Sequence, residues 1–388
     1  MIHTLQLRNF KGIEAADLRF ERFTVLVGPN ATGKTSVLQA LDLLSTFSDY
    51  RTDRESVIEA HGGLAALSRV DEGTVGIRAE GTWLQKPGQL QLEWQTTKSP
   101  SVGPRRQGLK VWGKWNGTDL EIPEEGRGMG MGMVDPRMNV PPALLETWRA
   151  SILLRLESRN LAEPSYTSEI EPGLQTDGWG LASALAQMAL NRPEDFAELL
   201  GALRTVIPQV VRVRLALAGI TRKEVETLRI NDEPISRHVT RNYSGHRILL
   251  DTKSGTGIPS EAASEGTLLI LGLLTVLMGK PRPKLVLLDD LDRGLHPKAQ
   301  RDLVAQLRKL LERDPELQII ATSHSPYLVD HLTPEEVRLS TVLPDGTIRF
   351  ASLTDHPDFE RWREEMRPGE FWSTVGEAWV GERKMEPA

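Results

Sequence analysis

The sequence predicts an α/β domain that is built from the two ends of the chain and interrupted by a mixed insert. Strand-like segments fill the first 27 residues and are followed by a helical pattern. After residue 260, short apolar strands alternate with amphipathic helices again. Because such alternation is typical of α/β folds, we assign residues 1–50 and 255–388 to one domain with a mixed sheet and flanking helices. Residues 51–254 are expected to form an α+β insert lobe that is partly integral to this domain.

The N-terminal segment contains two kinds of predicted strand and one helix. "IHTLQLRNF" alternates between apolar and polar residues, whereas "FTVLVG" is a continuous apolar run. A continuous run predicts a central strand that is buried on both faces. After "GPNATGKT", apolar residues recur at helical spacing, which predicts an amphipathic helix. These residues are Val37, Leu38, Leu41 and Leu44.

The insert is expected to contain strands at both ends and helices between them. Three segments alternate as antiparallel strands do: "TVGIRAEGTWL", "LQLEWQTT" and "LKVWGKW". Helices are expected over residues 142–157, 180–190 and 193–206, and strands over 209–217, 224–230 and 246–251. No heptad pattern persists over several turns, so a long coiled coil is not expected.

The C-terminal segment returns to buried strands and amphipathic helices. "KLVLLDD" and "LQIIATSHS" are apolar strands that end in polar residues, and "PKAQRDLVAQLRKLLER" between them is an amphipathic helix. Further strands are expected over residues 336–342 and 347–353. The tail "PGEFWSTVGEAWVG" contains two tryptophans and is expected to pack on the core.

Composition excludes several classes of protein. The 388 residues carry a formal net charge of −6 and a pI of about 5.9, so contact with nucleic acid would require a local basic patch. The chain has no cysteine, which excludes disulfides, thiolate zinc sites and a cysteine nucleophile. No apolar run reaches the roughly 18 residues of a membrane span, and the N-terminus lacks the apolar segment of a signal peptide. We expect a cytoplasmic protein without a membrane partner.

Residues Gly28–Thr35 fit the pattern G-x-x-x-x-G-K-[ST] of a P-loop. Glycines allow such a loop to wrap closely and to direct backbone N–H groups inward, and the helix that follows directs its N-terminus at the same point. The lysine reaches the β- and γ-phosphates, and the threonine hydroxyl is a ligand of Mg²⁺. A simple glycine turn explains the pattern less well, because a strand precedes the loop and a helix follows it. The predicted ATP-binding residues are Gly28, Pro29, Asn30, Ala31, Thr32, Gly33, Lys34, Thr35 and Ser36.

Three aspartates end the strand "LVLLDD". A P-loop requires an acid on a neighbouring strand to hold Mg²⁺ through water, and Asp289 occupies that place. Its plainer interpretation, a helix-capping residue, would not explain Asp289, Asp290 and Asp292 together. Asp290 lies where a general base could orient the attacking water. His324 ends the next apolar strand, either as a third polar group close to the γ-phosphate or as a capping or surface histidine.

These motifs together resemble the ABC-type ATPase heads, and more narrowly the prokaryotic group near the RecF, Smc and OLD ATPases, often described as AAA-family ATP-binding proteins. The opening through "NFKG" and the P-loop matches that group over residues 1–45. "ASEGTLLILGLL" resembles its signature segment, "LLDDLDRGLHP" its Walker B and D-loop, and "IIATSHSPYLVD" its switch-histidine strand. The order and spacing of four motifs make the resemblance much more specific than a P-loop alone.

The resemblance implies an ABC-type fold and a mechanism in which two heads associate head to tail around two ATP molecules. Ser264 and Gly266 would then contact the γ-phosphate held by Lys34 of the other copy. A hydroxyl and helix-start amides are suitable groups for binding an anion. The plainer interpretation of Ser264 is a helix N-cap, and both roles are compatible.

Two departures from the group's pattern matter. The group usually has a glutamate where this chain has Asp290, and a side chain shorter by one methylene predicts slow hydrolysis, because a misplacement of about 1 Å can cost on the order of 10²-fold in rate. Asp292 falls where the group often has another acid. The glutamine that usually joins the metal is not located: Gln39 is a poor candidate, and Gln175 and Gln187 remain open.

The sequence leaves three functional hypotheses. The first is an ATP-driven dimerisation switch in anti-phage defence or DNA maintenance that works with a separate effector, since the 64 residues after His324 leave no room for a Toprim nuclease domain. The second is a nucleotide-stabilised scaffold with little hydrolysis. The third is a RecF-like DNA-binding repair ATPase, for which "PRRQGLKVWGKW" offers Arg105, Arg106 and Lys110 beside two tryptophans.

Overall fold

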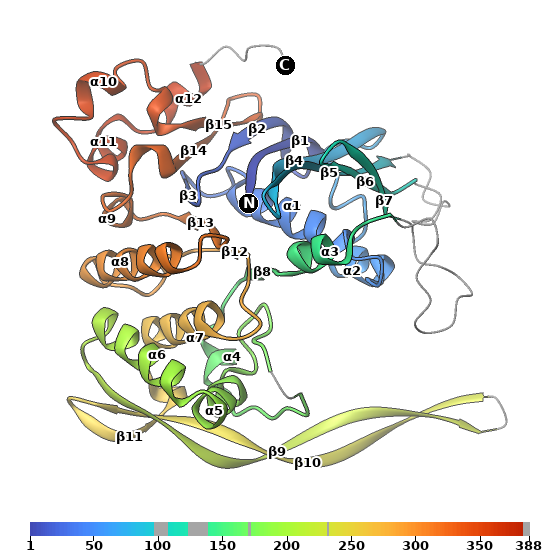
Figure 1. Cartoon of the computed structure of the whole chain (residues 1–388), viewed down its shortest axis with the longest axis vertical. Coiled ribbons are helices and arrows are strands. Elements are labelled where there is room, and N and C mark those ends of the chain that lie inside the picture. Colours follow the sequence, from blue (N-terminus) through green and yellow to red (C-terminus); the bar gives the residue numbers. More distant parts are fainter. Residues whose placement is uncertain (97–107, 123–138, 170–171, 231–232, 383–388) are drawn as a thin grey trace. The chain divides into compact units, whose positions relative to one another are not determined.

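The computed structural model describes residues 1–96, 108–122, 139–169, 172–230 and 233–382, without the side chains of 226–236. Contacts group the chain into two compact units (Figure 1). The first contains residues 1–153, 283–292 and 307–388, and the second contains residues 154–282 and 293–306. The boundary between residues 153 and 154 lies inside the stretch 51–254 that the sequence assigns to an insert lobe.

The central sheet of the first unit has six strands in the order β15-β14-β3-β13-β12-β8. Strands β14, β3, β13 and β12 are parallel, and β15 is antiparallel to β14. Every residue of β3, β12 and β13 is buried, as the continuous apolar runs predict. The predicted mixed sheet with α/β connections is therefore confirmed. The strands are β3 (Phe23–Val27), β8 (Ser151–Leu154), β12 (Leu285–Leu288), β13 (Gln318–Ser323), β14 (Val337–Val342) and β15 (Ile348–Ser352).

The other sheet of the first unit is antiparallel and also has six strands, in the order β2-β1-β4-β5-β6-β7. Alternate residues of β4 are buried, so one face of the sheet covers the core and the other faces solvent. Pairing of β1 with β4 joins the N-terminal segment to strands of the stretch 51–254. The strands are β1 (Ile2–Phe10), β2 (Ile13–Arg19), β4 (Gly73–Trp83), β5 (Lys86–Thr96), β6 (Lys110–Trp115) and β7 (Thr118–Ile122).

Helix α1 (Lys34–Phe47) packs between the two sheets of the first unit, since it contacts strands of both. Its buried residues include all four apolar residues predicted from helical spacing. Helices α2 (Arg54–Ala60) and α3 (Pro142–Arg149) are shorter. The C-terminal helices of this unit are α9 (Pro326–Val329), α10 (Phe359–Trp362), α11 (Pro368–Val375) and α12 (Ala378–Glu382). Helix α12 contacts β14 and β15, so the tail packs on the core as expected.

The second unit packs helices around α7 (Glu265–Met278) beside a long hairpin (Figure 1). Strand β9 (Val210–Ile230) pairs with β10 (Glu233–Thr252) along nearly its whole length, and the short β11 (Gly255–Pro259) adds to β10. The three ranges predicted as strands here lie almost entirely within β9 and β10, but they are parts of two long strands rather than three short ones. The helices are α4 (Ser158–Ala162), α5 (Leu181–Asn191) and α6 (Pro193–Val206); α8 (Pro297–Arg313) has its first ten residues in this unit.

No helix among the described residues is long and apolar enough to cross a membrane.

Candidate functional site

The phosphate loop connects the end of β3 to the start of α1 through backbone conformations that require small residues. Gly28 has φ 140° and Gly33 has φ 83°, both outside the range that side chains readily adopt. A Cβ at position 28 would lie 2.3 Å from the carbonyl oxygen of Ser340 on β14. Ala31 also has a positive φ, of 62°, although it is not a glycine. The left-handed conformation costs such a residue about 1–2 kcal/mol.

Lys34 lies folded over this loop. Its Nζ donates hydrogen bonds to the carbonyl oxygens of Gly28, at 2.9 Å, and Pro29, at 2.6 Å, and the residue is only 5% exposed. Burial lowers the pKa of Lys34 below its usual value, and the carboxylates of Asp290 and Asp289 oppose this shift. An anion in the loop would offer the ammonium group a better partner than two carbonyl oxygens.

The side chain of Thr35 points at the acid on the neighbouring strand. Its Oγ1 donates to Asp289 Oδ1 at 3.0 Å. Mg²⁺ holds its ligands at about 2.0–2.1 Å in an octahedron, so that adjacent ligand oxygens lie about 3 Å apart. The two oxygens therefore lie close enough together to hold one Mg²⁺ ion, Thr35 directly and Asp289 directly or through a water. The described residues contain no cluster of three or more acidic or histidine side chains suited to a metal.

The three aspartates lie in a tight turn, residues 289–292, that we call the acid turn. Asp290 has φ 57°, and its backbone N–H donates to Thr322 Oγ1 on β13 at 2.8 Å. The same hydroxyl donates to Asp289 Oδ1, also at 2.8 Å. Asp292 Oδ1 accepts the backbone N–H of His324 at 3.1 Å. The turn is thus held by the strand beside it.

Sheet order brings the predicted catalytic residues of the first unit together. Because β3, β13 and β12 are parallel neighbours, their carboxyl ends place Lys34, Asp289 and His324 along one edge of the sheet. The Nε2 atom of His324 lies 3.9 Å from Asp290 Oδ1. Both of these side chains are partly exposed, as groups that act on a bound substrate must be.

Ser264 and Gly266 lie in the second unit, at the start of α7. Ser264 caps the helix, with its Oγ accepting the backbone N–H of Thr267 at 3.3 Å. Its plainer interpretation as an N-cap is therefore observed. A Cβ at Gly266 would lie 2.4 Å from the carbonyl oxygen of Gly294, so this glycine is required by close backbone packing within the unit.

The other predicted residues either have partners elsewhere or lie outside the residues that the structure describes. Gln39 accepts a hydrogen bond from Lys11, and Gln187 accepts one from Asn191 on its own helix. Arg105 and Arg106 lie outside the described residues. Lys110 begins β6 and is exposed.

Three residues near the loop and the acid turn were not identified from the sequence. Ser340 places its Oγ 2.6 Å from Thr32 Oγ1, and Thr322 joins two of the aspartates. Glu377, in the tail, is close enough to Lys34 to act on the pKa of that lysine. Each lies on an element that only the fold brings to the site, so no local pattern could reveal them.

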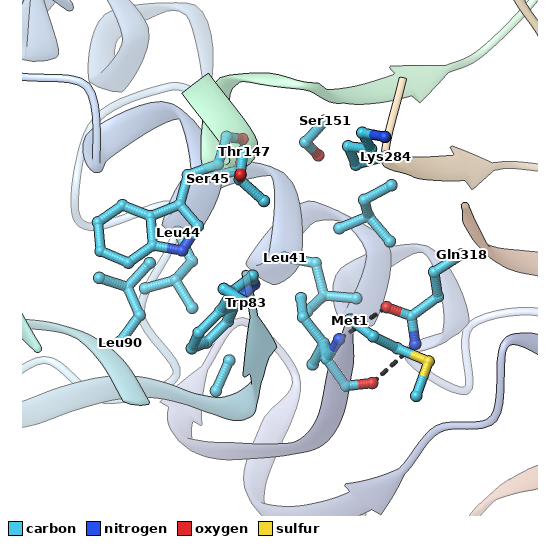
Figure 2. Close-up of a pocket in the computed structure, with 14 residues that line it drawn as sticks. Met1, Leu41, Leu44, Ser45, Trp83, Leu90, Thr147, Ser151, Lys284 and Gln318 are labelled. Carbon is cyan, nitrogen blue, oxygen red and sulfur yellow. Dashed lines mark hydrogen bonds between the residues drawn. The ribbon is translucent and has the colours of Figure 1, made fainter. Parts of the chain in front are cut away.

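A separate pocket of about 40 Å³ lies at the opposite ends of the parallel strands (Figure 2). Lys284 immediately precedes β12 and Gln318 begins β13, so the pocket lies at the amino ends of these strands. The phosphate loop follows the carboxyl end of β3, at the other edge of the sheet. The side-chain amide of Gln318 accepts the N–H of Ile2 at 2.8 Å and donates to the carbonyl of Ile2 at 2.7 Å. The pocket is too small for a nucleotide, because ligand pockets usually measure about 300–1,000 Å³.

Comparison with known proteins places the site in a wider group. A family model described as "AAA ATPase domain" matches residues 1–75, and one described as "AAA domain, putative AbiEii toxin, Type IV TA system" matches residues 154–330. The solved SmcHead bound to the C-winged helix domain of ScpA has a TM-score of 0.54 and 14% identity, covering 92% of this chain and 99% of that one. The DNA replication and repair protein RecF of Acinetobacter baylyi is 25% identical over 336 residues, which is 79% of this chain and 87% of that protein. These matches support an ABC-type ATPase head related to those of the RecF, SMC and OLD-like group.

Two relatives with higher identities match short stretches of the chain. RecF of Geobacter metallireducens is 50% identical over 48 residues, which is 12% of this chain and 13% of that protein. The OLD nuclease of Thermus scotoductus is 46% identical over 44 residues, 11% of this chain and 8% of the nuclease. The ABC-type head therefore spans only a small part of these relatives, and their whole-protein activities are not assigned to it.

Proposed function

We propose that this ABC-type head binds ATP with Mg²⁺, hydrolyses it slowly, and uses it to hold two copies of the chain together as a switch for a separate effector. The observation that carries the proposal is the convergence of Lys34, Thr35 and Asp289 with Asp290 and His324 at one edge of a parallel sheet. Ligands of α/β sheets bind outside the carboxyl ends of the strands.

Each residue has a distinct task in the proposed reaction. Lys34 exchanges the loop carbonyls for the β- and γ-phosphates, and Thr35 and Asp289 hold Mg²⁺, which neutralises phosphate charge when bound. Asp290 orients the water that attacks the γ-phosphate, and His324 donates to the oxygens that gain negative charge. Asp290 is a short acid, so hydrolysis is slow.

ATP turnover tests the enzymatic part of the proposal. The wild-type protein should release phosphate from ATP above background in the presence of Mg²⁺, and Asp290→Asn should reduce the rate by about 10²-fold or more, the contribution of a general base. Asparagine keeps the size of the side chain and tolerates the same left-handed backbone. Turnover by the wild type that never exceeds background would instead favour the scaffold hypothesis.

The proposed dimer can be tested at Ser264 without removing the helix cap. Asparagine and aspartate both cap helices well, but only aspartate would place a negative charge against the γ-phosphate of the other copy. Ser264→Asp should abolish ATP-dependent dimerisation measured by light scattering, whereas Ser264→Asn should preserve a substantial part of it. Equal dimerisation by both variants would show that Ser264 does not contact the γ-phosphate in the dimer interface.

A role in anti-phage defence or DNA maintenance is supported by the names of the matching proteins. One family model refers to a putative toxin of a toxin–antitoxin system, and several relatives are replication and repair proteins. Purification from the native host with ATP should recover a nuclease or toxin with the chain. Recovery of the chain alone in both the ATP-bound and ATP-free states would contradict an effector-coupled switch.

Direct DNA binding is the second candidate function, favoured by the RecF relatives and by exposed Lys110 on β6. Changing Arg105, Arg106 and Lys110 together to glutamine should weaken binding to a labelled duplex and flatten its dependence on salt. Lys298, an exposed lysine of α8, gives a matched control when changed to glutamine. Unchanged affinity in the triple variant would exclude this patch.

A further inference from the structure

The hydroxyl of Thr322 lies between the two aspartates of the acid turn. Thr322 is on β13, is fully buried, and has its Oγ1 2.8 Å from both the backbone nitrogen of Asp290 and Oδ1 of Asp289. It accepts a hydrogen bond from the first and donates one to the second. A threonine hydroxyl has one proton to donate, so its direction is fixed by these two partners.

Thr322 also continues the contact between β12 and β13 past the end of the regular ladder. The last paired residues are Leu288 and Ala321, and the next bond runs from the N–H of Leu291 to the carbonyl of Thr322, at 2.9 Å. Asp289 and Asp290 therefore lie in a turn that is closed by both the main chain and the side chain of one residue. Asp290 requires such support because φ 57° is an uncommon conformation for a residue other than glycine.

We propose that Thr322 is the positioning residue for both acids of the ATPase site. Its donated bond turns the carboxylate of Asp289 toward Thr35, whose own hydroxyl reaches the same oxygen at 3.0 Å. Its accepted bond fixes the backbone of Asp290 so that the carboxylate faces His324. One hydroxyl thus couples the position of the metal-binding acid to that of the acid that orients water; this inference rests on the proposed function for the roles of the two acids.

Two substitutions separate the hydroxyl from the rest of the side chain. Thr322→Val has nearly the same shape but neither donates nor accepts, so it should release both acids. Thr322→Ser keeps the hydroxyl and loses a methyl group. Thr24→Val on β3 is the matched control, because Thr24 is equally buried in the same sheet and its Oγ1 accepts the N–H of Glu21 at 2.9 Å, away from the acid turn.

The experiment measures ATP turnover and, independently, the Mg²⁺ dependence of ATP binding with a fluorescent ATP analogue. Thr322→Val should lower kcat by about 10- to 10²-fold, as expected for a misplacement near 1 Å. It should raise the Mg²⁺ concentration for half-maximal binding by about tenfold, the loss expected when a group that supports a metal ligand is removed. Binding of the analogue without Mg²⁺ should be unchanged, Thr322→Ser should restore most of both quantities, and Thr24→Val should leave them at the wild-type level.

Two results are distinguishable. If the wild type does not hydrolyse ATP, the proposed enzymatic function fails, but the Mg²⁺ dependence of binding still tests the position of Asp289. If Thr322→Val retains the wild-type kcat and Mg²⁺ dependence while its thermal stability falls as in Thr24→Val, the role of Thr322 is structural only and the inference is overturned.

Discussion

The phosphate loop and the acid turn lie at the ends of strands in one parallel sheet, yet their backbones are held in different ways. In the phosphate loop, Gly28 and Gly33 supply most of the unusual backbone angles directly. In the acid turn, Asp290 adopts a positive φ, and its backbone N–H donates a hydrogen bond to Thr322 on another strand, which holds it. The first geometry is encoded by local residue types, whereas the second depends on a tertiary contact. The phosphate loop should therefore lose its geometry when its own residues are changed, and the acid turn should lose its geometry when Thr322 on the neighbouring strand is changed.

The largest effect is expected when the phosphate loop loses its first glycine. In Gly28→Ala the added Cβ would lie 2.3 Å from the carbonyl oxygen of Ser340, so the loop and β14 must separate. Strain of up to about 3 kcal/mol corresponds to a loss of roughly 10²-fold in affinity for Mg²⁺·ATP. Titration with a fluorescent ATP analogue measures it.

Gly346→Ala is the matched control for that change. Gly346 has φ 81° but no described atom within 4 Å of an added Cβ, so it shares the backbone strain without the collision. Equal losses of affinity in the two variants would show that the close approach to Ser340 is not what matters.

A rise in turnover of about tenfold is expected for Asp290→Glu. The longer side chain should recover part of a penalty of about 10²-fold for misplacement, while glutamate tolerates the left-handed backbone less well than aspartate. Steady-state phosphate release measures the rate, and denaturant unfolding measures the accompanying loss of stability.

Asp292→Glu lengthens a second acid of the same turn and serves as the comparison. Asp292 accepts a backbone N–H from His324 and has no positive φ. A rate for Asp290→Glu that is unchanged or lower than that of the wild type would refute the idea that side-chain length limits hydrolysis.

ATP affinity should depend on pH through Lys34. Burial lowers the pKa of Lys34 in the free protein, while bound phosphates would favour the protonated form. Affinity should therefore fall as pH rises through the lowered pKa, at a pH below the usual lysine value, and binding should take up protons in that range. Calorimetry in buffers of different ionisation enthalpy detects this uptake; proton release on binding would contradict the assignment.

The smallest expected effect is a stabilisation by Ala31→Gly. Relief of the left-handed strain at residue 31 should raise the free energy of unfolding by about 1–2 kcal/mol. The greater freedom of glycine in the unfolded chain should lower it by about 0.4–1 kcal/mol. The free energy of unfolding should increase by roughly 0.5–1 kcal/mol, measured in urea. Ala150 has φ −74° and no left-handed strain to relieve, so Ala150→Gly should only lower the free energy of unfolding.

The sequence predicted the buried strands of the central sheet better than the exposed hairpin. Strands β3, β12 and β13 are buried on both faces: β3 and β12 are apolar apart from Thr24, and β13 has an apolar centre over residues 319–321. Strand β9 extends through residues 218–223, where Ile220 is the one large apolar residue among small and polar ones and no alternation of hydrophobicity marks the strand. Backbone pairing with β10 keeps this stretch extended, and Thr221 on β9 adds a side-chain hydrogen bond to Asn242 on β10.

By itself the sequence determined the phosphate loop, the acids that follow β12 and the histidine that follows β13, because the residue types required for these tasks are contiguous. Only the tertiary structure decided which strands are neighbours, and hence that Thr322, Ser340 and Glu377 lie near the loop or the acid turn. It also gave a reason for an aspartate at position 290: the turn holds that residue at φ 57°, a conformation in which aspartate is far more common than most residues. The physical reason is the distance along the chain over which each feature is determined. The backbone angles of a loop depend on adjacent residues, whereas a hydrogen bond between strands depends on the whole fold.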